Sequence, residues 1–97
     1  DVIEVDFGIP LKSELYQNYP NPFNPSTEIN YVLKESGQIK INVFNSLGSE
    51  IATLVDGFVS SGKHSINFNA KDFPSGIYFY RITANNFKST RKMLLIK

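Results

Sequence analysis

The sequence lacks several residue types on which whole classes of function depend. It contains no cysteine and no tryptophan, and it has one histidine, His64. Without cysteine, disulfide frameworks, thiolate zinc sites and cysteine nucleophiles are all excluded. Alanine, the best helix former, occurs only at positions 52, 70 and 84, which disfavours a helical protein. Apolar runs are also short: Met93–Ile96, near the end, is far below the ~20 residues that a membrane-spanning helix needs.

The residues that are abundant favour a single all-β domain. The chain has 97 residues, of which 41% are hydrophobic and 20% charged, a composition typical of a domain with its own core. β-branched and aromatic residues are frequent, and they fit a pleated, half-buried surface. The net charge of +1 is too small for binding nucleic acid by charge alone, so no nucleic-acid partner is expected.

Alternating apolar and polar residues predict the strands. Turn-forming residues separate the alternating stretches roughly every 8–12 residues, as in an immunoglobulin-like antiparallel β-sandwich of about seven strands. The stretch 76–84 is apolar on both faces, which predicts a central strand. The strands are predicted at residues 27–34, 38–45, 49–55, 63–69, 76–84 and 87–97, and the core at Ile29, Tyr31, Ile41, Val43, Phe68, Tyr80 and Ile82.

The connection after the second of these stretches has the residues of a hairpin. Asn45–Gly48 predicts a type I turn closed by Gly48 in the left-handed region. The strand that follows breaks its alternation at Ile51 and Leu54, which predicts a β-bulge there.

Two later turns are also predicted from their residues. Asp72–Gly76 predicts a turn with Pro74 in its second position and Gly76 as a turn residue close behind. Asn85-Asn86 predicts a tight primed turn, because asparagine tolerates positive φ.

The first fourteen residues have the composition of a linker. The charged residues among 1–14 are all acidic apart from Lys12, and we interpret the stretch as a linker or the end of an upstream region. Within them Val2–Phe7 alternates weakly and is a candidate short edge strand that ends before Pro10. Because the chain starts at Asp1 and shows no basic region followed by an apolar run, we expect a fragment or a processed product.

Residues 15–27 are rich in proline. Pro20, Pro22 and Pro25 each remove an amide donor and push the preceding residue toward an extended conformation, so a central strand is excluded here. We predict a stiff, extended segment with turns that closes one end of the sandwich. Its side-chain anchors are expected to be Leu15, Tyr16, Tyr19 and Phe23.

No constellation of residues points to catalysis, a cofactor or a metal ion. His64 alternates with Ile66 and Phe68, which predicts a structural position at the rim of the core. His64, Asp56 and a serine could be combined into a triad, but no motif fixes their geometry. The acidic residues form no calcium-binding loop, and no glycine-rich loop opens a helix. We therefore expect no catalytic residue, no cofactor and no metal site.

Positive charge is concentrated in the last ten residues, which contain Lys88, Arg91, Lys92 and Lys97. One interpretation is an edge strand whose lysines protect against edge-to-edge pairing. The other is a recognition surface, because charge asymmetry between chain ends is typical of interaction segments and an edge strand can accept a partner strand. Both interpretations remain open on the residues alone.

Several motifs occur in the order found in one known family. Residues 15–27, LYQNYPNPFNPST, resemble the opening motif of type A C-terminal sorting domains of the type IX (Por) secretion system of Bacteroidetes and related phyla. Ser49, where the family more often has a basic residue, is the main departure. The Pro-Ser-Gly-x-Tyr block is also shared with the immunoglobulin-like domain of flagellar hook-capping proteins. The resemblance is carried by segments 15–27, 43–55, 62–64, 74–81 and 92–97, with Pro20, Asn21, Pro22, Phe23, Asn24, Pro25, Gly48, Pro74, Gly76 and Tyr78 as motif residues.

The resemblance implies that residues 15–97 are a sorting signal and not an enzyme. In such proteins the upstream cargo crosses the inner membrane by its own signal peptide and folds in the periplasm. The translocon then recognises the C-terminal domain and carries the protein across the outer membrane. In many members a surface sortase cuts before the domain and attaches the cargo to lipopolysaccharide. The implied location is secreted or at the cell surface of a Gram-negative bacterium.

Two other functions remain open beside this one. The first is an extracellular carbohydrate-binding or adhesion module, which would need an exposed aromatic platform. The second is a passive structural spacer. The candidate residues for an aromatic platform are Tyr16, Tyr19, Tyr31, Tyr78 and Tyr80.

Overall fold

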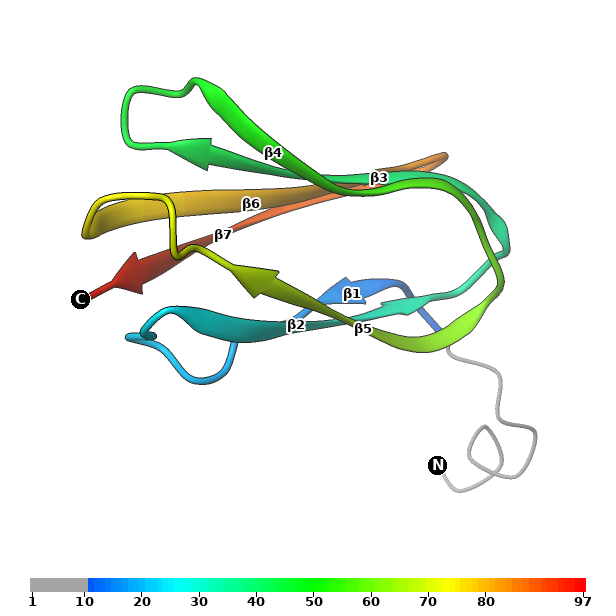
Figure 1. Cartoon of the computed structure of the whole chain (residues 1–97). Coiled ribbons are helices and arrows are strands. Elements are labelled where there is room, and N and C mark those ends of the chain that lie inside the picture. The colour runs from blue at the N-terminus through cyan, green and yellow to red at the C-terminus, as the bar shows by residue number, and fades with distance from the viewer. Residues whose placement is uncertain (1–10) are drawn as a thin grey trace.

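The chain folds into two antiparallel β-sheets packed face to face (Figure 1). The computed structural model describes residues 11–97, so the candidate strand at Val2–Phe7 lies outside the described residues. Within the described range there is no helix. The strands are β1 (Glu14–Leu15), β2 (Ser26–Leu33), β3 (Gly37–Asn45), β4 (Glu50–Val59), β5 (Gly62–Asn69), β6 (Gly76–Ala84) and β7 (Phe87–Leu95).

The strand order confirms the predicted immunoglobulin-like sandwich. One sheet has the order β1-β2-β5 and the other the order β4-β3-β6-β7, so β6 is an interior strand as predicted. Five of the predicted strands match the observed ones to within two residues. The exception is β4, which continues to Val59 instead of ending at Val55, because Gly57, Phe58 and Val59 extend its ladder with β3.

The core lies between the sheets and is built from every second side chain of β2, β3 and β6. All seven predicted core residues are buried, and Tyr80 is fully enclosed. Each large apolar side chain taken out of water contributes roughly 1.5–3 kcal/mol, so this layer dominates the stability of the domain. Further buried residues that join the core are Leu15, Phe23, Leu33, Ile39, Tyr78, Met93 and Leu95.

The β3–β4 hairpin has the predicted turn and the predicted bulge. Gly48 has a φ of +88°, and its N–H donates to the carbonyl oxygen of Asn45 at 3.0 Å. The ladder with β3 then shifts register twice, passing over Leu54 and Ile51. These are the two residues that break the alternation in the sequence.

Two turn predictions are wrong. No residue other than glycine has a positive φ in the described part of the chain, so Asn85-Asn86 connects β6 to β7 without a primed turn. The hydrogen-bonded turn before β6 closes from the N–H of Phe73 to the oxygen of Ala70 at 3.0 Å, upstream of Pro74. An Asx turn at the end of β5 reverses the chain early, and Gly76 is already the first residue of β6.

Candidate recognition site

The proline-rich residues 16–25, here called the closing segment, cross from the edge of one sheet to the edge of the other. Tyr19 pairs with Glu28 of β2 through two backbone hydrogen bonds of 3.0 and 2.9 Å. Further along, the N–H of Phe23 donates to the oxygen of Leu94, and the oxygen of Phe23 accepts from the N–H of Ile96, both at 3.0 Å. The closing segment therefore joins both sheets at one side of the sandwich.

Side chains of the closing segment cover more of the same strand edge. Gln17 Nε2 donates to the oxygen of Lys92 at 2.6 Å, and Asn21 Oδ1 accepts the N–H of Leu94 at 3.0 Å. The segment thus closes a lateral edge of the sandwich, whereas the sequence predicted closure of an end. Because the outward backbone groups from the oxygen of Lys92 to the N–H of Ile96 are occupied, the hypothesis of a free edge for strand addition is wrong for this part of β7.

Two buried polar residues hold the closing segment in shape. Asn18 and Thr27 are 2% and 1% exposed. Asn18 Nδ2 donates to Thr27 Oγ1 at 2.9 Å and to the oxygen of Pro20 at 3.1 Å, and Thr27 Oγ1 donates to the same oxygen at 2.8 Å. The three prolines have no N–H, so the segment has few backbone donors. The side chains of Asn18 and Thr27 supply donors in their place. Sequence reasoning missed both residues. The alternation of Thr27 with Ile29 and Tyr31 could have indicated its burial, whereas nothing in the pattern separates Asn18 from the exposed asparagines near it.

Phe23 and Tyr80 attach the closing segment to the core. Phe23 is buried, with its ring centroid 6.2 Å from that of Phe68. Tyr80 comes from β6, and its hydroxyl donates to the oxygen of Tyr16 at 2.6 Å. Burial raises the pKa of Tyr80 to about 12, so the phenol stays protonated and remains a donor across the neutral range.

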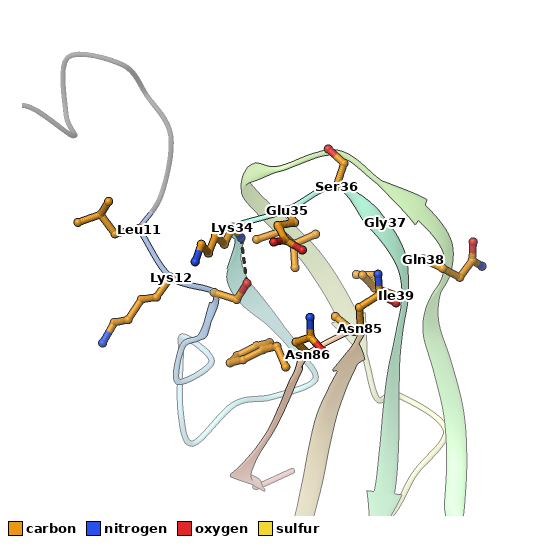
Figure 2. A pocket seen from close by; sticks show the side chains of 14 residues that line it. Leu11, Lys12, Lys34, Glu35, Ser36, Gly37, Gln38, Ile39, Asn85 and Asn86 are labelled. Carbon is orange, nitrogen blue, oxygen red and sulfur yellow. Dashed lines mark hydrogen bonds between the residues drawn. The ribbon is translucent and has the colours of Figure 1, made fainter.

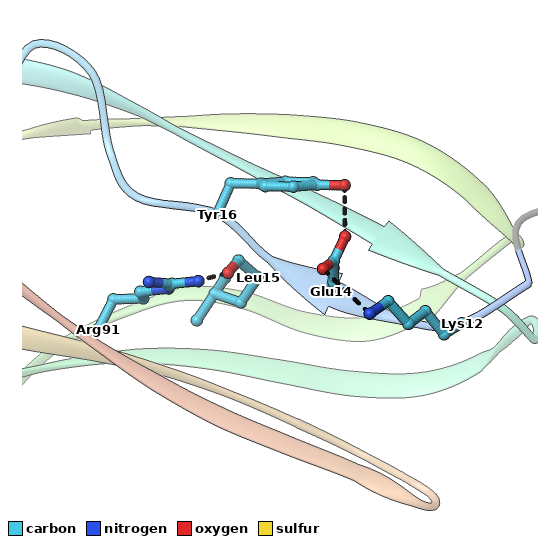
Figure 3. A network of polar contacts seen from close by, with 5 residues as sticks. All are labelled: Lys12, Glu14, Leu15, Tyr16 and Arg91. Carbon is cyan, nitrogen blue, oxygen red and sulfur yellow. Dashed lines mark hydrogen bonds and ion pairs between the residues drawn. The ribbon is translucent and has the colours of Figure 1, made fainter.

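The side chains of Tyr16 and Tyr19 do not anchor the segment, which corrects the prediction made for them. They are 41% and 78% exposed. Their backbone groups make the sheet contacts, and the rings project outward. The Tyr16 hydroxyl donates to Glu14 Oε1 at 2.7 Å, next to Lys12 (Figure 3). This bond lowers the pKa of the Glu14 carboxyl and raises the pKa of the Tyr16 phenol.

Of the four predicted recognition residues, Arg91 and Lys97 are engaged in contacts within the domain. Arg91 lies on the same face of β7 as buried Met93, and its Nε donates to the oxygen of Leu15 at 3.0 Å, which links the two sheets (Figure 3). Lys97 Nζ donates to the oxygen of Lys71 at 2.6 Å. Both cations therefore serve as hydrogen-bond donors to the domain's own backbone.

Lys88 and Lys92 are placed differently. Side chains alternate along a strand, so both point to the outer face of the four-stranded sheet, away from Met93 and Leu95. Both are exposed, and neither forms an ion pair with a carboxylate of residues 11–97. The four basic residues that are close in sequence are thus divided between two faces and one chain end.

The Pro-Ser-Gly-x-Tyr block fixes the end of β7. Tyr78 is buried, and its hydroxyl donates to the oxygen of Pro74 at 2.6 Å. Ser75 Oγ accepts the N–H of Lys97 at 2.9 Å. Gly76 has a φ of +154°, which side chains rarely adopt. The block therefore has a structural role in holding the terminal strand.

The remaining motif residues lie on the surface of the closing segment. Pro20, Asn21, Pro22 and Asn24 are exposed. The oxygen of Pro25 accepts the N–H of Ala70 at 2.8 Å, which connects the end of the segment to the end of β5.

His64, the candidate for a triad, is held by contacts with its neighbours. His64 stacks on Tyr31 with ring centroids 5.4 Å apart, and its Nε2 lies 2.7 Å from the oxygen of Ser60. Within residues 11–97 no three His, Asp or Glu side chains come together as metal ligands. A cavity of about 320 Å³ opens at one end of the sandwich, between Leu11 and the turns after β2 and β6 (Figure 2), and its lining is mixed. Over the same range, no helix has the length and apolar character to cross a bilayer.

These features define a small β-sandwich whose distinctive part is an N-terminal motif that is bonded to its C-terminal strand. Residues 17–97 match the family described as the secretion system C-terminal sorting domain. The chain belongs to this family of type IX secretion sorting domains. A search of curated proteins gave no match. Domains of this family are sorting signals, and the family is not one of enzymes. They direct an upstream cargo across the outer membrane to the cell surface or the outside.

Proposed function

We propose that residues 15–97 are recognised as a folded unit by the type IX translocon, after the cargo has reached the periplasm of a Gram-negative bacterium. A surface sortase then cuts before the domain and anchors the cargo at the cell surface. The observation that carries this proposal is the family match over residues 17–97, which covers the six strands β2 to β7.

The structure supports cleavage ahead of the domain. Leu11 is 68% exposed, and β1 begins only at Glu14. A cut before Ser13 would therefore remove no strand and no buried side chain of the described domain. The boundary after residue 14 stays a prediction.

The test is export of a reporter. In a bacterium with type IX secretion, residues 1–97 are fused to the C-terminus of a periplasmic reporter, with the reporter alone as the control. We expect the fusion to reach the surface and to lose the domain, as seen from the mass of the surface form. Retention of the fusion in the periplasm would contradict the sorting function. Surface arrival of the uncut fusion would contradict the sortase step alone.

The carbohydrate-binding alternative gains no support from the side chains that it needs. Tyr31, Tyr78 and Tyr80 are buried in the core. The exposed Tyr16 is hydrogen-bonded to Glu14, and neither Tyr16 nor Tyr19 lines the cavity at the end of the sandwich. We therefore do not propose a sugar platform.

A further inference from the structure

The outer face of the four-stranded sheet has an apolar region that the two-layer fold does not explain. On β6, Tyr78, Tyr80 and Ile82 point into the core. The residues between them, Ile77 and Phe79, therefore point outward. No layer of the described chain covers this face, and yet β6 is apolar on both sides.

The register of the sheet gathers these outward residues into two neighbouring rows. Phe44 of β3 is paired with Phe79, which is paired with Lys92 of β7. In the next row Ile77 is paired with Leu94. Ile77 is 43% exposed, whereas Phe44, Phe79 and Leu94 are half-buried by their neighbours. We call the five residues of these two rows, Phe44, Phe79, Lys92, Ile77 and Leu94, the outer patch.

The border of the outer patch is positively charged on the β7 side. Lys92 closes the Phe44–Phe79 row, and Lys88, paired with Thr83, lies two rows farther along the same face of β7. Arg81 lies on the same face of β6, with its guanidinium carbon 4.7 Å from the centroid of the Phe44 ring. None of these cations forms an ion pair with a carboxylate of residues 11–97.

The far end of the same row carries a carboxylate in place of a cation. Glu50 of β4 is paired with Phe44, and its Oε2 accepts hydrogen bonds from Asn42 Nδ2 at 2.9 Å and Thr53 Oγ1 at 2.8 Å. These donors are neutral, so Glu50 keeps its negative charge, and the positive charge at the outer patch lies on its β6 and β7 side. An apolar centre with cations along one side is the complement of an apolar protein surface with carboxylates on the facing side of its rim.

We propose that the outer patch is the docking surface of the sorting signal, and that its partner is an apolar, acid-rimmed protein surface of the type IX machinery. This inference rests on the proposed function and specifies where recognition takes place. It also accounts for the division of the basic residues. Lys88 and Lys92 face the partner, while Arg91 and Lys97 hold the domain together. An ordinary solvated face, with Arg81 lying over Phe44 merely to cover it, is the alternative that the experiment decides.

The experiment compares matched variants in the reporter fusion. Ile77→Asn and Lys92→Glu alter the outer patch. Phe58→Asn and Lys63→Glu are the controls, because they make the corresponding apolar-to-Asn and Lys-to-Glu changes elsewhere. Phe58 lies on the same sheet beside Gln38, three rows from Phe79, and Lys63 lies on β5. All four side chains are exposed, so purified variants should melt within a few degrees of the wild type. We expect each patch variant to lower surface arrival on the order of tenfold, as for a central contact of an interface, and each control to export like the wild type.

Folded patch variants that are exported as well as the controls would overturn the inference, and so would controls that fail as badly as the patch variants. If the wild-type fusion itself stays in the periplasm, the proposed function fails, which is a separate result. If Ile77→Asn proves unstable, the pair Lys92→Glu and Lys92→Arg decides, because the inference requires loss of export with Glu and its retention with Arg.

Discussion

The two lateral sides of the sandwich differ in whether their strand edges are covered. On one side, the closing segment occupies the outward backbone groups from the oxygen of Lys92 in β7 to the N–H of Ile96 just after it. On the other side, β5 is a regular eight-residue strand, and no part of the described chain pairs with its outer edge. The comparison shows what the proline-rich motif does physically. The motif ends a sheet with residues that cannot pair with a further strand, because proline has no N–H to donate.

The two sides also differ in how they are kept from pairing with another chain. β4, the neighbouring edge on the open side, is interrupted by the bulges at Ile51 and Leu54, which disrupt a ladder. On the covered side the protection depends on one buried ring, the two backbone hydrogen bonds of Phe23 and a few side-chain hydrogen bonds. Mutations should therefore act strongly on the covered side and weakly on the open side.

The largest effect is expected from Phe23→Ala. Removing a buried phenylalanine from a packed core costs about 3–5 kcal/mol, and here it also frees the edge of β7. Chemical denaturation should show this loss, and hydrogen exchange should show faster exchange of the Leu94 and Ile96 amides. Phe58→Ala, at an exposed phenylalanine, is the control and should change stability by about 0.5 kcal/mol or less. Equal effects of the two variants would contradict the role of Phe23.

A smaller loss is expected from Asn18→Ala. The change removes the hydrogen bonds of Asn18 Nδ2 to Thr27 and Pro20 in a buried site, which costs about 1–3 kcal/mol. Thermal unfolding measures the loss. Asn24→Ala, at an exposed asparagine of the same motif, should leave stability nearly unchanged. If both variants melt alike, the buried network does not hold the segment.

Tyr80→Phe tests the same attachment through pH. At neutral pH, losing the bond to the oxygen of Tyr16 should cost about 1 kcal/mol. The folded pKa of about 12 lies above the ordinary value of 10.0, so the stability that Tyr80 contributes is present below pH 10 and is lost as pH rises to 12. Denaturation at several pH values should show the wild type losing about 2 kcal/mol more than the variant over this range. Parallel pH profiles would contradict the assignment.

The sequence could predict the strands because their signal is local. Alternation at Ile29, Tyr31, Ile41 and Val43 predicts the buried face correctly, and the breaks at two positions of β4 predict its bulges. The same alternation already places Arg91 on the opposite face from Lys88 and Lys92, although closeness in sequence suggested a single basic group. Local pattern could thus have divided the candidate recognition residues.

The closing of β7 could not be predicted in this way. Phe23 pairs with Leu94 and Ile96, and Gln17 with Lys92, across most of the length of the chain. Such pairings depend on how the sheets pack, which no local pattern specifies. The prediction that the side chains of Tyr16 and Tyr19 anchor the segment is wrong for the same reason. The motif is extended, but its contacts with both sheets are made largely by backbone and amide groups.

The smallest effect is expected on the open side, from Ser65→Pro. On β2, the backbone groups of Glu28 and Asn30 face the closing segment, so those of Ile29 and the alternate residues face β5. Ile29 is paired with Ile66, so the backbone groups of Ser65 point outward from β5. Proline at such an edge position removes no ladder bond and should cost about 1 kcal/mol or less.

The neighbouring change is the matched control for this last prediction. Ile66→Pro removes an N–H that points toward β2 and should cost at least about 3 kcal/mol, as an interior proline does. Denaturation of the two variants measures the difference, and sedimentation shows whether an outward proline alters self-association. A Ser65→Pro variant as unstable as Ile66→Pro would mean that the outer edge of β5 is not free, and the contrast between the two sides of the sandwich would fail. With the expected result, the open edge is held by its inward bonds alone, and the covered edge is the one that depends on the motif.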